Sequence, residues 1–236
     1  MAFTRIVISP ALSERFPDAR VGWLLADARV RASDPYVEEL KKNLAANLAS
    51  RGITEENLAK QPDIAAWRDV YSAMGAKPSK YRSSLEALAR RVAKGQGLWN
   101  VSNVVDCYNC ASVATFLPMG AHDTSRVDGV LTLRYGHAGE KFYPLGADEQ
   151  HEVIDVDPRN VVYADDSKIC CWLWNHRDTH LASVQEETKE AIFLIDSAFV
   201  PHTTSIEGGL EILAGHLEKI GCKPKDRGIV RPGDTA

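Results

Sequence analysis

Apolar residues recur at helical spacing through the first half of the chain. Pro35 suits the first position of the clearest such segment, and Gly52 follows its last turn. Between them Val37, Leu40 and Leu44 share one face, which predicts an amphipathic helix. The same spacing predicts three further helices in this half and one near the C-terminal end, over 64–74, 83–92, 101–116 and 205–220.

Short runs of β-branched and aromatic residues replace the helical spacing from residue 127 onward. Such runs predict strands, here over 130–135, 161–163, 169–174 and 191–195. Two more strands are predicted ahead of the first helix, over 3–9 and 20–31. Because helices lead and strands follow, the order favours an α+β fold over alternating βαβ units.

The domain organisation follows from the same patterns. The 236 residues contain no internal repeat and no low-complexity linker, which favours one large domain. We expect residues 1–60 to form an N-terminal extension packed on this domain and residues 61–222 to form its body. Residues 223–236 are expected to be a loose tail, since they contain two prolines and no periodic pattern.

Composition and charge narrow the class of protein. Hydrophobic content of 44% and charged content of 25% are ordinary for a soluble globular protein, and no apolar run reaches bilayer length. The N-terminal stretch lacks an apolar run of signal-peptide length, so a cytoplasmic protein that is not bound to membranes is expected. The sequence does not indicate an oligomeric state.

A formal net charge of −4 argues against nucleic-acid binding over the whole surface, and no DNA partner is expected. Any RNA contact would need a local basic patch. One candidate is a run of six cations, Lys77, Lys80, Arg82, Arg90, Arg91 and Lys94. The same run is also typical of a solvated helix face, and charge alone does not choose between these two interpretations.

Five cysteines, an odd number, make a disulfide framework unlikely in a chain of this composition. Cys107 and Cys110 have the spacing of a metal or redox pair, but no second pair follows. Buried small apolar residues are the favoured interpretation of both. We therefore expect no metal and no cofactor.

Four short blocks between Lys77 and Phe199 are the most specific feature of the sequence. They are Pro78–Arg91, Asn103–Asn109 with Pro118–Asp123, Gly139–Phe142, and the segment from Tyr163–Asp166 through Trp174–Asp178 to Thr188–Lys189. Together these blocks resemble stand-alone relatives of the editing domain in the β subunit of phenylalanyl-tRNA synthetase, a domain that hydrolyses tRNA carrying the wrong amino acid.

This resemblance implies both a fold and an activity. It implies a β-sandwich-like core of mixed or antiparallel sheets with flanking helices. It also implies hydrolysis of the ester that joins an amino acid to the 3′ end of tRNA, by a positioned water and without a nucleophilic side chain. The chain shows no ATP-binding core and no anticodon-binding module, so it is not expected to be a complete phenylalanine–tRNA ligase.

The resemblance also implies site residues. Asn109 ends an Asp-x-x-Asn segment that lines the pocket in the synthetases, next to Tyr108. On the residues alone, Asn109 is equally consistent with a helix position whose amide bonds nearby backbone. His122 lies two places later than the synthetase histidine, whose place Gly120 takes. A catalytic His122 and an exposed loop histidine are both open.

The remaining implied residues follow from the same blocks and from Ile192–Asp196, which is similar to a strand of the synthetases. Asp196 stands nearest to the glutamate that recognises a tyrosine hydroxyl in the synthetases. Catalysis is assigned to Asn109, His122 and Glu140, and tRNA binding to Arg82, Arg90, Arg91 and Arg177. Substrate binding is assigned to Tyr108, Gly120, Asp123, Cys170, Cys171, Trp174, Asn175 and Asp196.

Two functions are therefore open. The first is an enzyme that deacylates mischarged aminoacyl-tRNA in trans. The second is a non-catalytic module derived from such a domain, which binds an amino acid or RNA. Asn109, Glu140 and Asp196 favour the enzyme, whereas Cys170 and Cys171, in place of a small-residue pocket wall, favour the binding module.

Overall fold

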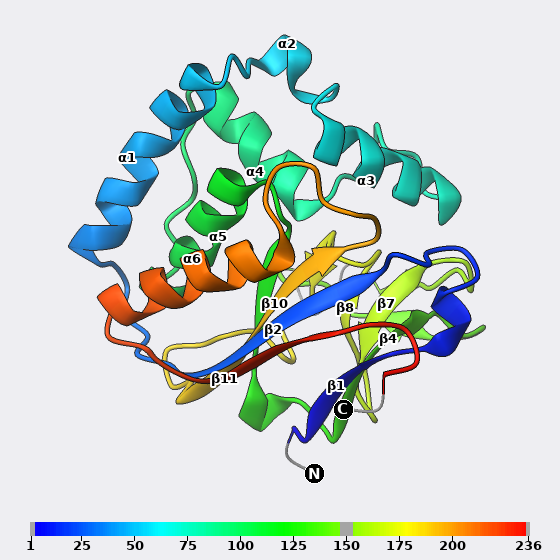
Figure 1. Cartoon of the computed structure of the whole chain (residues 1–236). Helices are drawn as coiled ribbons and strands as arrows, with labels where there is room; N and C mark the ends of the chain where they lie inside the picture. The colour runs from blue at the N-terminus through cyan, green and yellow to red at the C-terminus, as the bar shows by residue number, and fades with distance from the viewer. Residues whose placement is uncertain (1–2, 147–152, 235–236) are drawn as a thin grey trace.

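Two β-sheets packed face to face form the centre of the molecule, and a layer of helices covers the outer face of one of them (Figure 1). The computed structural model describes residues 3–146 and 153–234. Sheet A has the strand order β1-β4-β7-β8-β9, and sheet B has the order β11-β2-β10-β3. A small hairpin of β5 and β6 is separate from both sheets.

The strands are β1 (Arg5–Ile8), β2 (Arg20–Asp27), β3 (Met119–Asp123), β4 (Val130–Tyr135), β5 (Lys141–Phe142), β6 (Ile154–Asp155), β7 (Val161–Ala164), β8 (Ile169–Trp172), β9 (Arg177–Asp178), β10 (Glu190–Ser197) and β11 (Lys223–Val230). The helices are α1 (Pro35–Ser50), α2 (Glu55–Leu58), α3 (Pro62–Ala73), α4 (Ser84–Ala93), α5 (Asn103–Thr115) and α6 (Ile206–Lys219), with short 3-10 turns η1 (Pro10–Leu12) and η2 (Thr124–Arg126).

Strand β10 is buried on both faces, and its side chains alternate between two cores. Ile192 and Leu194 point into the core between the sheets, whereas Phe193 and Ile195 point into the core under the helices. This alternation has the period of two that a strand imposes. Asp196 follows in the same register as Leu194, so its carboxylate faces the interior of the sandwich.

The helices cover the outer face of sheet B in two steps. Helices α5 and α6 pack directly on the sheet, and α1 and α4 pack on α5. Helix α3 instead closes one end of the sandwich, where Trp67 and Tyr71 join the core between the sheets. Sheet A is mixed, because β1 pairs with β4 in parallel while its other pairs are antiparallel.

These observations confirm the expected α+β class with mixed and antiparallel sheets. The predicted helices over 64–74, 83–92, 101–116 and 205–220 correspond to α3, α4, α5 and α6. Three strand predictions were too long, and the first of them, over 3–9, is confined to Arg5–Ile8. The strand predicted over 20–31 ends at Asp27, and the strand predicted over 169–174 ends at Trp172, where the backbone turns left-handed.

Both ends of the chain differ from expectation. The first 60 residues were expected to be an extension packed on the domain, and their strand β2 lies within sheet B itself, between β10 and β11. The loose tail predicted over 223–236 is wrong for Lys223–Val230, which form β11. This strand pairs with β2 at the edge of the sheet, and its backbone hydrogen bonds do not require an apolar pattern.

None of the described helices combines the length and the apolar character needed to cross a membrane.

Candidate functional site

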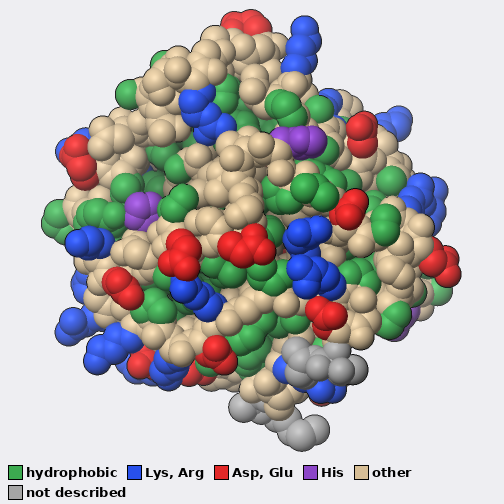
Figure 2. All heavy atoms as spheres, viewed as in Figure 1, with side chains coloured by type: hydrophobic (Ala, Val, Ile, Leu, Met, Phe, Trp, Pro, Cys, Tyr) green, Lys and Arg blue, Asp and Glu red, His purple; other side chains and the backbone are tan. Residues whose placement is uncertain are grey.

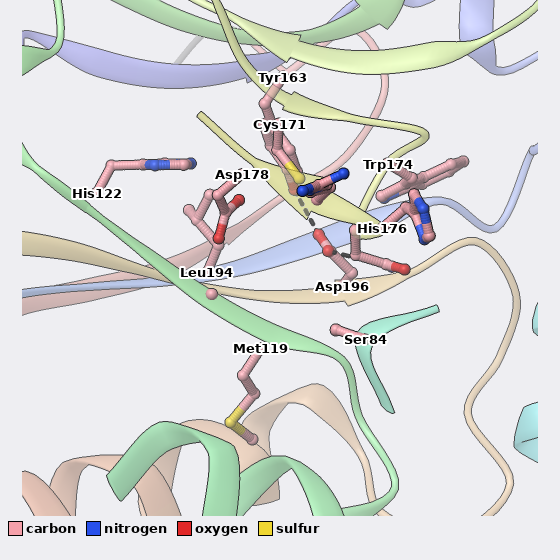
Figure 3. Close-up of a pocket in the computed structure, with 13 residues that line it drawn as sticks. Ser84, Met119, His122, Tyr163, Cys171, Trp174, His176, Asp178, Leu194 and Asp196 are labelled. Atoms are coloured by element: carbon pink, nitrogen blue, oxygen red, sulfur yellow. Dashed lines mark hydrogen bonds between the residues drawn. The ribbon is translucent and has the colours of Figure 1, made fainter. Parts of the chain in front are cut away.

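A cavity of about 60 Å³ lies between the two sheets, beside the C-terminal half of β10 (Figure 3). Sheet B, the 173–176 turn and sheet A each supply part of its wall, and α4 adds one serine. The lining residues are Met119, Gly120, His122, Leu194 and Asp196 from sheet B, Tyr163, Cys171, Arg177 and Asp178 from sheet A, Trp174, Asn175 and His176 from the turn, and Ser84.

The Asp196 carboxyl group is the buried acid of this cavity whose pKa lies near neutrality. It is only 3% exposed and accepts hydrogen bonds from the Tyr163 hydroxyl and, at 3.3 Å, from Asn175 Nδ2. Burial raises the pKa of Asp196 to about 7 and the charge of Asp178 adds to the increase, while the two hydrogen bonds oppose it. The carboxyl group can therefore exchange a proton near neutral pH.

The turn that carries Trp174 and Asn175 has an unusual backbone. Leu173 and Trp174 have φ angles of 52° and 65°, a region that side chains with a Cβ rarely adopt. Such a conformation costs about 1–2 kcal/mol per residue, so the surroundings must hold it. The backbone N–H of Trp174 donates to the Val161 carbonyl at 2.7 Å, and the indole ring of Trp174 packs against Trp67 with centroids 5.4 Å apart.

Helix α3 also holds this turn. The Tyr71 hydroxyl lies 2.9 Å from the Leu173 carbonyl oxygen and 3.1 Å from Asn175 Oδ1. Because Asn175 Oδ1 faces Tyr71, its Nδ2 is left to donate to Asp196. Backbone strain of this kind clusters at functional sites, where it positions side chains.

His122 lies on β3 and is 1% exposed, which excludes the exposed-loop interpretation. Its imidazole extends into the cavity region between the sheets (Figure 3). Burial lowers the pKa of His122, so the ring is neutral at pH 7. Its Nδ1 has no hydrogen-bond partner among the residues that the structure describes.

All five cysteines are free and buried, as expected for apolar packing residues. Burial raises the pKa of the Cys171 thiol in the cavity, and it raises the pKa of Cys110 to about 12. These thiols are therefore protonated at neutral pH and unsuited to nucleophilic attack. Within 3–146 and 153–234, no three His, Cys, Asp or Glu side chains are grouped closely enough to hold a metal ion.

The cavity brings together more than half of the residues assigned to substrate binding, together with one catalytic and one tRNA-binding candidate. These are Gly120, Cys171, Trp174, Asn175 and Asp196, with His122 and Arg177. A Cβ added to Gly120 would meet no atom within 4 Å, so the missing side chain keeps this wall open.

Two of the three catalytic candidates lie elsewhere. Asn109 is partly exposed on α5, which packs on the outer face of sheet B, whereas Asp196 faces the inner side. Asn109 is therefore not among the residues that line the cavity around Asp196. Glu140 forms an ion pair with Arg134 and accepts from the His137 N–H at 2.7 Å, also away from the cavity.

Three substrate-binding candidates have structural contacts outside the lining. The Tyr108 ring packs against Phe193 under the helices, with centroids 6.4 Å apart. Asp123 accepts from the Thr188 hydroxyl at 2.6 Å and from Ser125. Cys170 is fully buried beside the lining residue Cys171. These packing contacts and hydrogen bonds give each of the three buried residues a structural role that needs no ligand.

Sequence reasoning missed Tyr163, Asp178, His176 and Ser84 as site residues. All four stood inside the blocks that carry the family resemblance. Strand alternation could have identified Tyr163 and Asp178, because each faces the same sandwich interior as its neighbours in the cavity. The backbone reversal at Leu173 and Trp174 brings in His176, and no local pattern predicts that reversal.

A basic groove of about 260 Å³ adjoins this cavity. Its lining residues are Lys80, Arg82, Ala87, Arg90, Arg91, Lys94, Gln96 and His176. His176 lines both the groove and the cavity, so the two are neighbours. The groove contains five of the six clustered cations. On the face seen in Figure 2, positive and negative side chains are interspersed.

The arginines in the groove are not all free charges. Glu86, which is 1% exposed, lies within 2.8 Å of Arg68, 3.2 Å of Arg90 and 3.6 Å of Arg82. Arg91 stacks its guanidinium over the exposed Trp99, 3.9 Å from the ring centroid. The helix-face interpretation thus needs a correction, because part of this cluster is an ion-pair network around a buried carboxylate.

Comparison with known proteins gives the family. The model of the B3/4 domain matches residues 66–209, more than half of the chain. Over 82 residues the chain is 33% identical to the phenylalanine–tRNA ligase β subunit of Chromobacterium violaceum, an alignment that covers 35% of this chain and 10% of the ligase subunit.

Among solved structures, an N-terminal fragment of the phenylalanyl-tRNA synthetase β subunit from Pyrococcus horikoshii aligns with 100% of this chain and 53% of the fragment. The TM-score is 0.49 and the sequence identity is 11%. The resemblance to the synthetase β subunit is confirmed by the family model and the ligase match, and the chain belongs to the B3/4 domain family.

Proposed function

We propose that this chain hydrolyses the ester bond of mischarged aminoacyl-tRNA in the cavity around Asp196. The observation that carries the proposal is the convergence of two proton-exchanging groups, Asp196 and neutral His122, on one small polar cavity. A general base works best when its pKa lies near the operating pH. A cavity of about 60 Å³ also has room for bound water.

The reaction needs few groups. A water held by one of these acceptors attacks the ester carbonyl carbon, and its proton passes to that acceptor. The tetrahedral intermediate then expels the ribose oxygen, which takes a proton in turn. Such proton transfer by a positioned side chain contributes about 10²–10⁴-fold to a rate. Membership of a family that includes part of a phenylalanine–tRNA ligase β subunit supports this substrate class.

The cavity favours a small amino acid over tyrosine. Tyr163 already occupies the Asp196 oxygen that a substrate hydroxyl would need. A cavity of about 150 Å³ accepts a benzene ring, whereas this one measures about 60 Å³. The tyrosine recognition implied by the synthetase glutamate is therefore not proposed for this chain.

Deacylation is the direct test. With no ATP and no added metal ion, the chain is expected to accelerate deacylation of at least one tRNA in a panel mischarged with small amino acids. Gly120→Val should lower that rate by about 10²-fold, because the valine side chain fills the cavity that holds the water. A loss of this size is the lower end of what proton transfer by a positioned side chain contributes to a rate. The added Cβ meets no atom within 4 Å, and circular dichroism with the melting temperature establishes that the variant is folded.

The control for this test is Asp18→Asn, an exposed carboxylate outside the cavity, which should leave the rate unchanged. If no aminoacyl-tRNA in the panel is hydrolysed faster than in buffer, the hydrolase proposal fails. Equal rates for Gly120→Val and the unmodified chain would place the reaction outside this cavity.

We also propose that the basic groove binds the tRNA backbone. The groove adjoins the cavity at His176, where Arg91 lies in the last turn of α4 and Lys94 is its C-cap residue. The stacked Arg91 and Trp99 provide the aromatic and cationic combination that single-stranded nucleic acid uses. This arrangement would place a bound 3′ end near Asp196.

The double variant Arg91→Ala, Lys94→Ala should bind all tRNAs more weakly and flatten the salt dependence. The slope of log Kd against log salt should fall by about one unit for each lost phosphate contact. The choice of amino acid should not change, because phosphate contacts do not identify the side chain. Filter-binding titrations over a range of salt measure the slope.

A matched double variant, Lys42→Ala with Lys60→Ala, removes the same charge from exposed positions outside the groove. An equal slope in the two double variants would assign the cluster to a solvated helix face instead.

The binding-module alternative has one observation in its favour. Asp196 is already satisfied by Tyr163 and Asn175, so the polar groups of the cavity do not all require a substrate. A chain that binds tRNA or an amino acid but hydrolyses no ester would support this alternative.

A further inference from the structure

Asp178 is a charged cavity residue that the proposed hydrolysis does not use. Its carboxylate lines the cavity from β9 and is only partly exposed. No Lys, Arg or His side chain within the described residues forms an ion pair with it. The guanidinium of the neighbouring Arg177 donates a hydrogen bond to the Leu145 carbonyl oxygen at 3.1 Å. Asp178 is therefore a partly buried negative charge without a counter-ion in the described chain.

The surrounding groups respond to this charge. The Asp178 carboxylate contributes to raised pKa values for Cys171, Tyr163 and Asp196, which also face the cavity, and for Tyr108. A neighbouring negative charge disfavours the ionised form of an acid and so raises its pKa. Asp178 thus places a negative charge on the cavity wall, and a bound cation would neutralise it.

His122 supplies an independent indication that a ligand belongs there. His122 is only 1% exposed, and its Nδ1 has no hydrogen-bond partner within 3–146 and 153–234. A buried polar atom without a partner costs about 1–3 kcal/mol. Because burial lowers the pKa of His122, the ring is neutral and does not compete with a cation for Asp178.

We propose that Asp178 binds the α-ammonium group of the aminoacyl ligand, with His122 Nδ1 hydrogen-bonded to a polar atom of the same ligand. The inference rests on the proposed function for the identity of the ligand. An ammonium group is a compact charge with three donors, which suits a small cavity better than the wide fork of a guanidinium. Acylation of the amine removes the charge and should abolish recognition.

The test compares two small probes that cannot be hydrolysed as esters. Alaninamide carries the ammonium group, and N-acetylalaninamide does not. In NMR titrations of the isotope-labelled full chain at pH 6.5, alaninamide should bind roughly tenfold more tightly or better, as expected for a hydrogen bond to a charged partner. Asp178→Asn should remove this preference, and Asp18→Asn should retain it.

Three results would overturn the inference: equal binding of the two probes, no binding of either, or a preference that persists in a folded Asp178→Asn variant. Circular dichroism and the melting temperature establish that the variant is folded, and Asp178→Glu, which keeps the charge, should recover part of the preference.

Deacylation assays separate the two proposals. An ammonium preference without hydrolysis supports this inference and defeats the hydrolase, whereas hydrolysis of free and N-acetylated aminoacyl-tRNA at equal rates defeats this inference alone.

Discussion

The unmodified chain is expected to lose folding stability as the pH rises from about 4 to 7, and the Asp196→Asn variant is expected not to show this loss. In the unfolded chain Asp196 ionises near its ordinary pKa of 3.8, whereas burial raises the pKa in the folded chain to about 7. The folded chain therefore holds a proton that the unfolded chain has released. Its stabilising contribution is complete below pH 3.8 and is lost as the pH rises through 7.

The expected size of this effect is about 4 kcal/mol, because the pKa rises by about three units and each unit corresponds to about 1.4 kcal/mol. Asparagine cannot ionise, and its Oδ1 can still accept from the Tyr163 hydroxyl. Urea unfolding at pH 4.5, 6, 7 and 8 measures the difference in free energy of unfolding between the two chains. The exposed variant Asp18→Asn controls for other groups that titrate over this range.

At pH 8 the Asp196→Asn chain should be the more stable, and at pH 4.5 the two should be nearly equal. Parallel stability curves would show that Asp196 is ionised in the folded chain at neutral pH, and its role as a proton-exchanging group would be withdrawn.

The helices could be predicted from sequence because their signals are local. Asp34 caps α1 by accepting from the Tyr36 N–H at 2.9 Å, directly before Pro35. Ser83 caps α4 in the same way, accepting from the Glu86 N–H at 3.2 Å. The Glu86 carboxylate does not return to the Ser83 backbone to complete a capping box, because it pairs with arginines instead.

Strand β11 shows where local signals end. Its sequence, Lys-Pro-Lys-Asp-Arg-Gly-Ile-Val, lacks an alternating apolar pattern, and the strand exists because β2 offers a free edge. Pairing of this kind depends on tertiary contacts and not on propensity. The position of β2 in the centre of sheet B was unpredictable for the same reason, because its partners β10 and β11 lie far along the chain.

The site was predictable where a family block supplied a residue that also faces the sandwich interior. Asn175 and Gly120 meet both conditions. Asn109 meets only the first, because the helix that carries it packs on the opposite face of sheet B. Which face a block occupies is decided by sheet register, and register between distant strands is not written in the blocks themselves.

Glu86→Gln is expected to change stability and RNA affinity in opposite directions. The Glu86 carboxylate is 1% exposed and is surrounded by the guanidinium groups of Arg68, Arg82 and Arg90. Loss of its charge leaves three cations close together without their shared partner. Breaking a buried ion pair costs about 3–5 kcal/mol, and we expect about 3 kcal/mol because these arginines are partly exposed to water.

The folded part of the same variant should bind tRNA more tightly, because one negative charge has left the wall of the basic groove and the arginines are free to contact phosphates. The matched control is Glu55→Gln. It removes the same charge from a carboxylate whose side chain is 42% exposed and that pairs with Lys94 at 3.1 Å. Exposed pairs contribute about 0–1 kcal/mol, so this control should remain nearly as stable as the unmodified chain.

Urea unfolding and tRNA titrations, made below the unfolding transition of each variant, separate the two effects. If the groove contacts phosphates, both variants should gain affinity and steepen the salt dependence, and only Glu86→Gln should lose stability. Unchanged affinity in both would mean that the arginines around Glu86 serve folding alone, as the partners that keep a buried carboxylate in the first turn of α4. The phosphate contacts would then have to be sought on another face of the domain.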